Sequence, residues 1–146
     1  MSIWVTPRTI AELTAASCNT ASAAVGVQFT AIGDDWVEAT LPLDERTERD
    51  AGVVDPGALA ILAETLGSIA ATMSIDTTRR MCLGQTLHVR HLQAAMAGPL
   101  RGRATPLDIG ERAQLWKIQV QNPSDQCVCI AQLAVAVLDR LPSAPA

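Results

Sequence analysis

One segment of the chain places a single carboxylate among apolar and small residues. Between Gly57 and Ile75, the only ionisable side chain is that of Glu64. At about 100° per residue, the bulky residues of this segment fall on one helical face and Glu64 falls on the opposite face. The bulky residues are Leu59, Leu62, Leu66, Ile69 and Met73. Ser68 follows Glu64 by one turn, so its hydroxyl is expected beside the carboxylate.

The other residues on the face of Glu64 are small or uncharged. They are Gly57, Ala60, Ile61, Ser68 and Ala71. A surface helix normally exposes several charges, so this second face is predicted to be covered as well, by a ligand or by another subunit. A lone carboxylate in such a place either takes part in chemistry or pairs with a charge across a subunit interface. The residues alone leave both interpretations open.

A second candidate, His91, lies near the end of the strand predicted from Met81 to Gln93. Leu83, Leu87 and Val89 alternate along this strand and are expected to share one face. His91 continues the row, so its ring is expected to point toward the helix. An imidazole in that position can transfer protons or can form structural hydrogen bonds.

The helix is predicted to begin at Asp55-Pro56-Gly57. Aspartate is a preferred N-cap, and proline suits the first helical position because an N–H there has no intrahelical acceptor. The other elements are predicted from apolar alternation and turn residues. They are a helix over Thr9 to Ser17 and strands over Val25 to Ile32, Trp36 to Leu43, Met81 to Gln93, Leu100 to Leu107, Ala113 to Gln121 and Cys127 to Leu138. Asp44 to Gly52 is charged and is predicted to be an exposed loop.

This order of elements is a hairpin, then a long helix, then a four-stranded meander. It predicts one α+β domain over residues 1–146, in which an antiparallel sheet wraps around the helix. With 49% hydrophobic and 18% charged residues, the domain is expected to hide apolar surface in a homo-oligomer, a dimer or a tetramer. Residues 1–10 lack the pattern of a secretory signal, and Glu64 interrupts the most apolar segment. We therefore expect a cytoplasmic protein with no membrane partner.

The charges and cysteines narrow the expected ligands. The net charge of -4 disfavours a nucleic-acid partner, but residues 79–146 hold eight basic and four acidic side chains. Arg79, Arg80 and Arg112 are candidates to bind phosphate groups in this basic half. A GC-rich genome would also favour arginine over lysine without any function. The four cysteines lack metal-ligand spacing and are interpreted as buried thiols. No metal and no cofactor is expected.

The segment from Gly57 to Ser68 resembles the hotdog-fold thioesterase superfamily, and the likeness extends over nearly the whole chain. Supporting segments are Ile32 to Asp35, Gly84 to His91, Pro106 to Gly110 and Ala134 to Leu138. The chain is most similar to the glutamate-dependent branch with the 1,4-dihydroxy-2-naphthoyl-CoA, 4-hydroxybenzoyl-CoA and enterobactin-proofreading thioesterases. The resemblance implies a hotdog fold and a thioester substrate. It also implies that Glu64 is the nucleophile or general base, and that Ser68 and His91 position the acyl group or water.

The chain departs from the family pattern around the thioester carbonyl. The family's histidine-glycine-glycine run is Asp55-Pro56-Gly57 here, and the expected glutamine of the preceding loop is Arg49. The resemblance assigns the oxyanion hydrogen bond to an N–H that Pro56 lacks. Asp55 adds a negative charge at the same place. The Gly57 N–H, the helix dipole or Arg49 are the candidate replacements.

Three functions therefore stay open from the sequence. The leading one is hydrolysis of a coenzyme A or acyl-carrier-protein thioester. A hydratase or isomerase could instead use Asp55 and Glu64 as an acid and base pair. A non-catalytic acyl-CoA-binding protein is the third, in which Asp55 and Pro56 serve only the helix start after catalysis was lost or moved.

Overall fold

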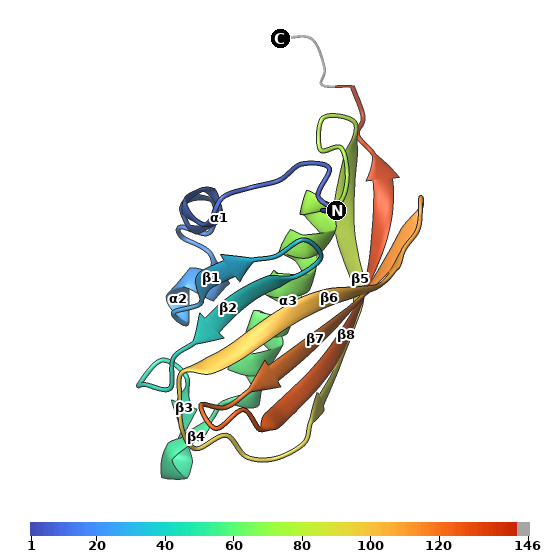
Figure 1. Cartoon of the computed structure of the whole chain (residues 1–146). Coiled ribbons are helices and arrows are strands. Elements are labelled where there is room, and N and C mark those ends of the chain that lie inside the picture. Colours follow the sequence, from blue (N-terminus) through green and yellow to red (C-terminus); the bar gives the residue numbers. More distant parts are fainter. Residues whose placement is uncertain (143–146) are drawn as a thin grey trace.

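The computed structural model describes residues 1–142 of the chain. Its helices are α1 (Ile10–Ala16), α2 (Ala21–Ala24) and α3 (Pro56–Met73), with one 3-10 turn at Asp50–Gly52. The strands are β1 (Gln28–Ile32), β2 (Val37–Leu41), β3 (Glu48–Arg49), β4 (Val53–Val54), β5 (Arg80–His91), β6 (Leu100–Ile109), β7 (Ala113–Gln121) and β8 (Cys127–Asp139). The predicted α+β class is confirmed, because a six-stranded antiparallel sheet curves around α3 (Figure 1).

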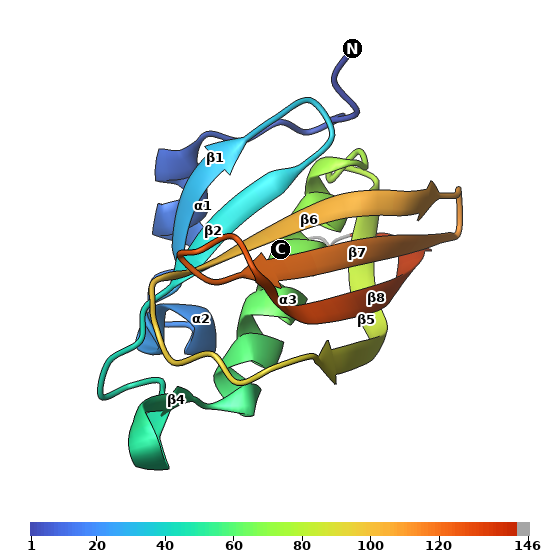
Figure 2. The ribbon, with the colours of Figure 1, turned by 60° about the horizontal axis from the view of Figure 1, so that its bottom comes forward.

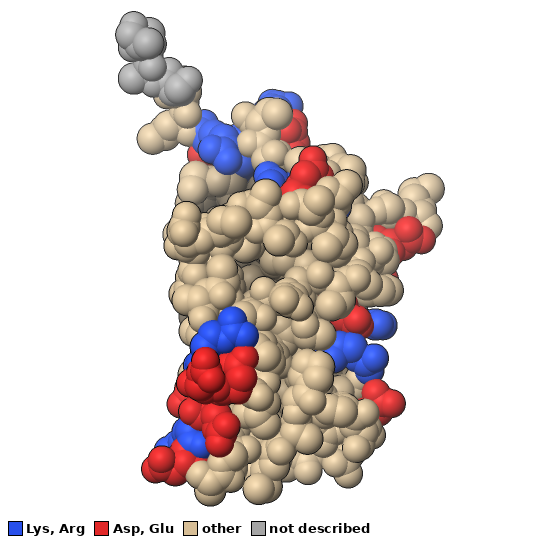
Figure 3. Space-filling model, turned by 90° about the vertical axis from the view of Figure 1, so that its left-hand side faces the viewer, with Lys and Arg blue, Asp and Glu red and all other residues tan. Residues whose placement is uncertain are grey.

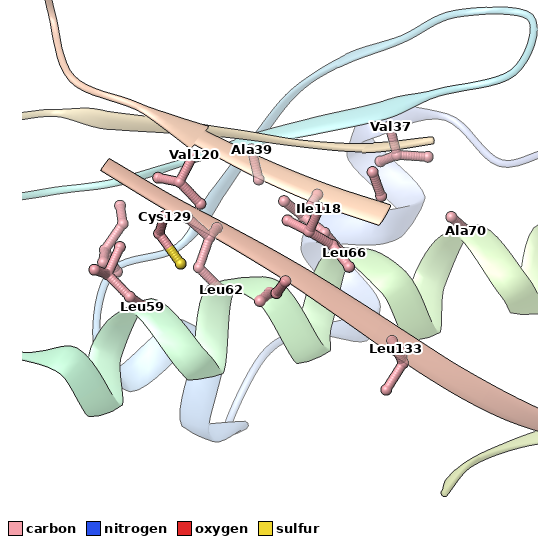
Figure 4. Close-up of a cluster of buried hydrophobic side chains, with 14 of the residues drawn as sticks. Val37, Ala39, Leu59, Leu62, Leu66, Ala70, Ile118, Val120, Cys129 and Leu133 are labelled. Carbon is pink, nitrogen blue, oxygen red and sulfur yellow. The ribbon is translucent and has the colours of Figure 1, made fainter. Parts of the chain in front are cut away.

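Helix α3 forms where the sequence predicted it and packs its bulky face into the sheet. Asp55 caps its start by accepting a hydrogen bond from the Ala58 N–H, and Pro56 occupies the first turn. Leu59, Leu62 and Leu66 are buried and point toward side chains from several strands (Figure 4). These strand residues include Val37, Ala39, Ile118, Val120 and Cys129. The burial of this face fixes the rotation of α3, and it thereby directs Glu64 away from the sheet centre.

The strand order in the sheet is β1-β2-β6-β7-β8-β5. The predicted four-stranded meander is therefore wrong, because β5 pairs with β8 and leaves β6 to pair with β2. The chain leaves α3 at one edge of the sheet and crosses to the middle after β5, and Figure 2 shows the resulting curved layer over the helix. Loop lengths and the alternation of apolar residues do not indicate which strands distant in sequence will pair. As a result, β5 is an edge strand.

A β-bulge at Gln85 divides β5 into two parts that face differently. Leu87 lies opposite the buried Leu133, so this part of the strand faces α3. Before the bulge, Leu83 lies opposite Ala136 on the outer face and is 52% exposed. The prediction that Leu83 shares a face with Leu87 is therefore wrong, because one extra residue reverses the alternation. The same reversal turns Gly84 toward the helix.

Four short elements were not predicted, namely α2, β3, the 3-10 turn and β4. Helix α2 begins after Thr20, whose hydroxyl accepts a hydrogen bond from Ala23 N–H, and it shortens the strand expected from Val25. The charged segment expected to be an irregular loop contains β3 and the 3-10 turn, and β3 pairs with β4.

Cys18 is exposed, which corrects its interpretation as a buried thiol, whereas Cys129 is buried.

Candidate active site

The carboxylate of Glu64 and the hydroxyl of Ser68 meet on the outer side of α3. Ser68 donates a hydrogen bond of 2.8 Å to Oε1 of Glu64, as their spacing of one helical turn predicts. Both residues are half-buried. The hydrogen bond leaves Oε2 of Glu64 without a partner among residues 1–142. One oxygen is thus held in place while the other is available to react.

Gly84 on β5 gives the carboxylate its room. A Cβ atom at this position would lie 2.8 Å from Oε1 of Glu64 and 3.5 Å from Cδ1 of Leu133. Any side chain here would have to displace the carboxylate or the strand. Sequence reasoning missed this role, although a glycine inside a strand is a recognised sign of close approach by another group.

An apolar groove of about 410 Å³ opens beside Glu64. It runs between α2, α3 and β5, and we call it the α2–α3 groove. Its lining residues are Thr20, Ala21, Ser22, Ala60, Ile61, Glu64, Thr65 and Leu87. Glu64 is the only ionisable residue among them, so the one charge of the groove is also the candidate reacting group.

The start of α3 shows how Asp55 and Pro56 are used structurally. The Asp55 carboxylate accepts the Ala58 N–H at 3.1 Å, and the Asp55 N–H donates to the Thr47 carbonyl oxygen at 2.6 Å. Pro56 has no N–H to offer. Gly57 is exposed, and its N–H has no acceptor among the described residues. Gly57 therefore provides the free backbone donor of the first helical turn.

His91 lies at this helix start and not at Glu64. It lines a separate cavity of about 290 Å³ together with Val54, Pro56, Leu59 and other neighbours. Glu64 does not line this cavity, and His91 does not line the α2–α3 groove. Glu64 therefore lies with Ser68 near the middle of α3, whereas His91 lies with Pro56 at the start of the helix.

The candidate arginines also lie away from Glu64. Arg79 and Arg80 line a cavity of about 490 Å³ beyond the C-terminal end of α3. Arg80 pairs with Glu111 at 3.2 Å, and Arg112 pairs with Asp139 at 3.2 Å. Arg49 is exposed on β3, close in sequence to the helix start. Within residues 1–142, no three His, Cys, Asp or Glu side chains gather as a metal site would require.

Comparison with known proteins decides the family. Residues 51–129 match the family model of the thioesterase superfamily. The chain belongs to this superfamily. It is 36% identical over 138 residues to the proofreading thioesterase EntH of Cronobacter turicensis, an alignment that covers 93% of this chain and 98% of that protein.

Solved thioesterase structures show the same fold. A thioesterase from Haemophilus influenzae superimposes with a TM-score of 0.92 at 30% identity and covers 98% of this chain and 99% of its own. A mutant thioesterase from Pseudomonas aeruginosa gives a TM-score of 0.91 at 29% identity, covering 95% of this chain and 100% of its own. The expected hotdog fold is confirmed, and membership of the superfamily supports thioester hydrolysis. The segment matched to the family model includes Glu64, Gly84 and His91 and begins after α2.

Proposed function

We propose that this superfamily member hydrolyses an acyl-CoA or acyl-carrier-protein thioester with Glu64 as the nucleophile or general base. The observation that carries the proposal is the position of Glu64, whose carboxylate is the single charge of an apolar groove and is held by Ser68. A carboxylate in such surroundings has few competing partners and is available for chemistry.

As a nucleophile, Oε2 of Glu64 would attack the thioester carbonyl carbon. The carbon–sulfur bond would break, the thiolate would leave and take up a proton, and water would then hydrolyse the acyl-glutamate anhydride. As a general base, the same oxygen would take a proton from water while the water oxygen attacks the carbonyl carbon. The carbon–sulfur bond would then break, and the leaving thiolate would take up the proton held by Glu64. In both routes, Ser68 is a positioning residue that fixes Oε1, and the carboxylate is regenerated at the end.

A donor for the developing oxyanion must come from elsewhere. Gly57 carries the free N–H, but it lies seven residues before Glu64, which is about 10 Å along the helix axis. One thioester carbonyl cannot contact both groups within a single protomer. The same spacing argument separates Asp55 from Glu64, so an acid and base pair of these two carboxylates is also too widely spaced within one protomer.

A second copy of the chain would resolve this separation. A twofold axis beside Ala60 and Ile61 makes two α3 helices antiparallel, and Gly57 and Glu64 lie almost equally far from that point. Glu64 of one copy would then face Gly57 of the other. We therefore propose a composite site, in which one copy supplies the carboxylate and the other supplies the N–H donor.

Strand β5 offers the surface for such a dimer. It is 12 residues long and lies at the edge of the sheet. A long open edge favours pairing with another strand, and two residues of β5 itself, Met81 and Leu83, are exposed and apolar. Pairing two β5 strands antiparallel extends the sheet through the dimer and brings the two α3 helices together. The predicted homo-oligomer thus gains a specific geometry.

Of the three arginines that the sequence offers as phosphate ligands, two are held in ion pairs. Arg80 and Arg112 are engaged with Glu111 and Asp139, whereas Arg79 is exposed and has no ion-pair partner within residues 1–142. We therefore propose Arg79 as the first candidate to bind a phosphate of the thiol carrier. Arg49 and the helix dipole stay proposed as further aids to the oxyanion.

The test is thiol release from coenzyme A and acyl-carrier-protein thioesters by the wild-type chain and by Glu64→Gln. The proposal expects release by the wild type and its near-complete loss in the variant. Wild-type turnover that persists in Glu64→Gln would exclude Glu64 from either role. Tight binding of acyl-CoA without any release by the wild type would favour a non-catalytic binding protein.

A further inference from the structure

We propose that the α2–α3 groove holds an aliphatic acyl chain, and that Ala21 on α2 limits its length. The proposal rests on the proposed function, because it takes Glu64 as the group that meets the thioester carbonyl. The groove begins at Glu64 and continues to the start of α2. An acyl chain bonded to that carbonyl would therefore enter the groove directly.

The groove presents hydrocarbon surface to its occupant. Ala21, Ala60, Ile61 and Leu87 line it from three different elements. Ala60 and Ile61 also lie beside the twofold axis of the proposed dimer, so the second copy would close the groove on that side. Figure 3 shows the face of the molecule that carries α1 and α2, and its charged side chains gather toward the margins around an uncharged central area. Apolar surface of this kind favours methylene groups over polar substituents.

The hydroxyl groups at the far end of the groove are already engaged. Thr20 Oγ1 donates to the Ser17 carbonyl oxygen at 2.6 Å and lies 2.8 Å from Ser22 Oγ. Thr20 Oγ1 also accepts from the Ala23 N–H. The two hydroxyl groups are hydrogen-bonded to each other, and that of Thr20 also caps α2. They are therefore poor partners for a hydroxyl group on a substrate. A ring hydroxyl that reaches the α2 end of the groove would lose hydrogen bonds to water and regain few of them there.

No aromatic side chain lines the groove. The chain has one phenylalanine and three tryptophans, and the fold uses all of them elsewhere. Phe29 is buried in the core, Trp4 stacks on Trp116 with ring centroids 6.2 Å apart, and Trp36 lies 4.0 Å from the guanidinium of Arg103. The groove therefore lacks the stacking and edge contacts that help to select an aromatic ring.

Helix α2 forms the far wall and lies outside the segment matched to the family model. Ala21 is exposed at the first position of this short helix and lines the groove, whereas Ala24 is exposed on the same helix and does not. A larger residue at 21 should shorten the groove without disturbing the core. The same change at 24 is a matched control.

The experiment compares kcat/KM for straight-chain acyl-CoA thioesters of increasing length with that for benzoyl-CoA and 4-hydroxybenzoyl-CoA. We expect kcat/KM to rise by about fourfold per added methylene until the groove is filled. The best aliphatic substrate should exceed both aryl substrates by at least about tenfold. Ala21→Phe should lower the ratio of kcat/KM for medium chains to that for acetyl-CoA by about tenfold, whereas Ala24→Phe should leave this ratio unchanged.

Aryl thioesters turned over as well as the best aliphatic substrate would overturn the proposal, as would equal effects of Ala21→Phe and Ala24→Phe. A second measurement separates this failure from failure of the proposed function. Unreactive S-alkyl-CoA and S-benzyl-CoA thioethers can be titrated calorimetrically into the full chain. Tighter binding of the alkyl compound, weakened by Ala21→Phe, supports the groove assignment even if no thioester is hydrolysed. Tighter binding of the benzyl compound contradicts it.

Discussion

Oε1 of Glu64 lies against the backbone of Gly84, so close that a Cβ atom at residue 84 would stand 2.8 Å from it. The two residues come from the central helix and the edge strand, and the β-bulge at Gln85 sets their approach by turning Gly84 inward. The absence of a side chain at residue 84 is therefore part of how the carboxylate is positioned.

Gly84→Ala is expected to lower kcat by about ten- to a hundredfold, because the new methyl group pushes the carboxylate from its position beside Ser68. The backbone of Gly84 is not among those with positive φ, so alanine adds no conformational strain. Steady-state kinetics check the effect, and thermal unfolding checks that the fold is kept. Thr86→Ala on the outer face of the same strand is the control. Unchanged kcat in Gly84→Ala would show that the carboxylate does not need this contact.

The helix start offers a gain-of-function prediction. Replacing Pro56 by glycine restores an N–H, and replacing Asp55 by histidine removes the negative charge near the oxyanion. If the missing donor limits the rate, Asp55→His combined with Pro56→Gly should raise thiol release by roughly ten- to a thousandfold. Pro56→Gly alone should help less, since Asp55 would still repel the oxyanion.

The double variant also loses the Asp55 cap on the Ala58 N–H, which should cost about 1 kcal/mol of unfolding free energy. Chemical denaturation measures that cost separately from activity. A double variant that is stable but slower than the wild type would mean that Asp55 has its own catalytic role. That result would favour the hydratase or isomerase hypothesis.

Assembly can be tested through the half-buried centre of α3. The chain should be at least a dimer of the 15.4 kDa protomer at micromolar concentration. Ala60→Arg is expected to weaken the dimer by at least tenfold, because two guanidinium groups would be forced together beside the proposed twofold axis. Light scattering measures the mass, with Ala24→Arg on exposed α2 as the control. A wild-type mass of 15.4 kDa would exclude the composite site.

The cysteines give a pH-dependent prediction. Burial raises the pKa of Cys129, and likewise that of Cys82, from 9.0 to about 11. The unfolded thiols ionise first, so their contribution to stability is present below pH 9.0 and is lost as pH rises toward about 11. At mildly alkaline pH, exposed Cys18 should react with a disulfide reagent at least tenfold faster than Cys129. Peptide mapping identifies the modified residue. Equal rates of modification at Cys18 and Cys129 would contradict the burial of Cys129.

The sequence predicted those parts of the fold that depend on local patterns. The Asp55 cap, the apolar face of α3 and the bounds of β7 follow from residue type and periodicity, and Ser68 reaches Glu64 because one helical turn separates them. These features need no knowledge of the rest of the chain.

The parts that were not predicted depend on partners distant in sequence or on single-residue irregularities. The choice of β8 as the neighbour of β5 is decided by packing over the whole sheet, and the bulge at Gln85 reversed the predicted face of Leu83. The close approach of Gly84 to Glu64 follows from both. Helix α2 was missed because four residues are too few to show a period.

The central claim is that the Glu64 carboxylate performs the chemistry, and Glu64→Gln tests it most directly because glutamine keeps the shape and can still accept from Ser68. Initial rates of thiol release from acyl-CoA thioesters should fall by at least about a hundredfold in this variant, with its unfolding midpoint and its oligomeric mass unchanged. A folded Glu64→Gln protein that retains more than roughly a tenth of the wild-type rate would contradict the claim.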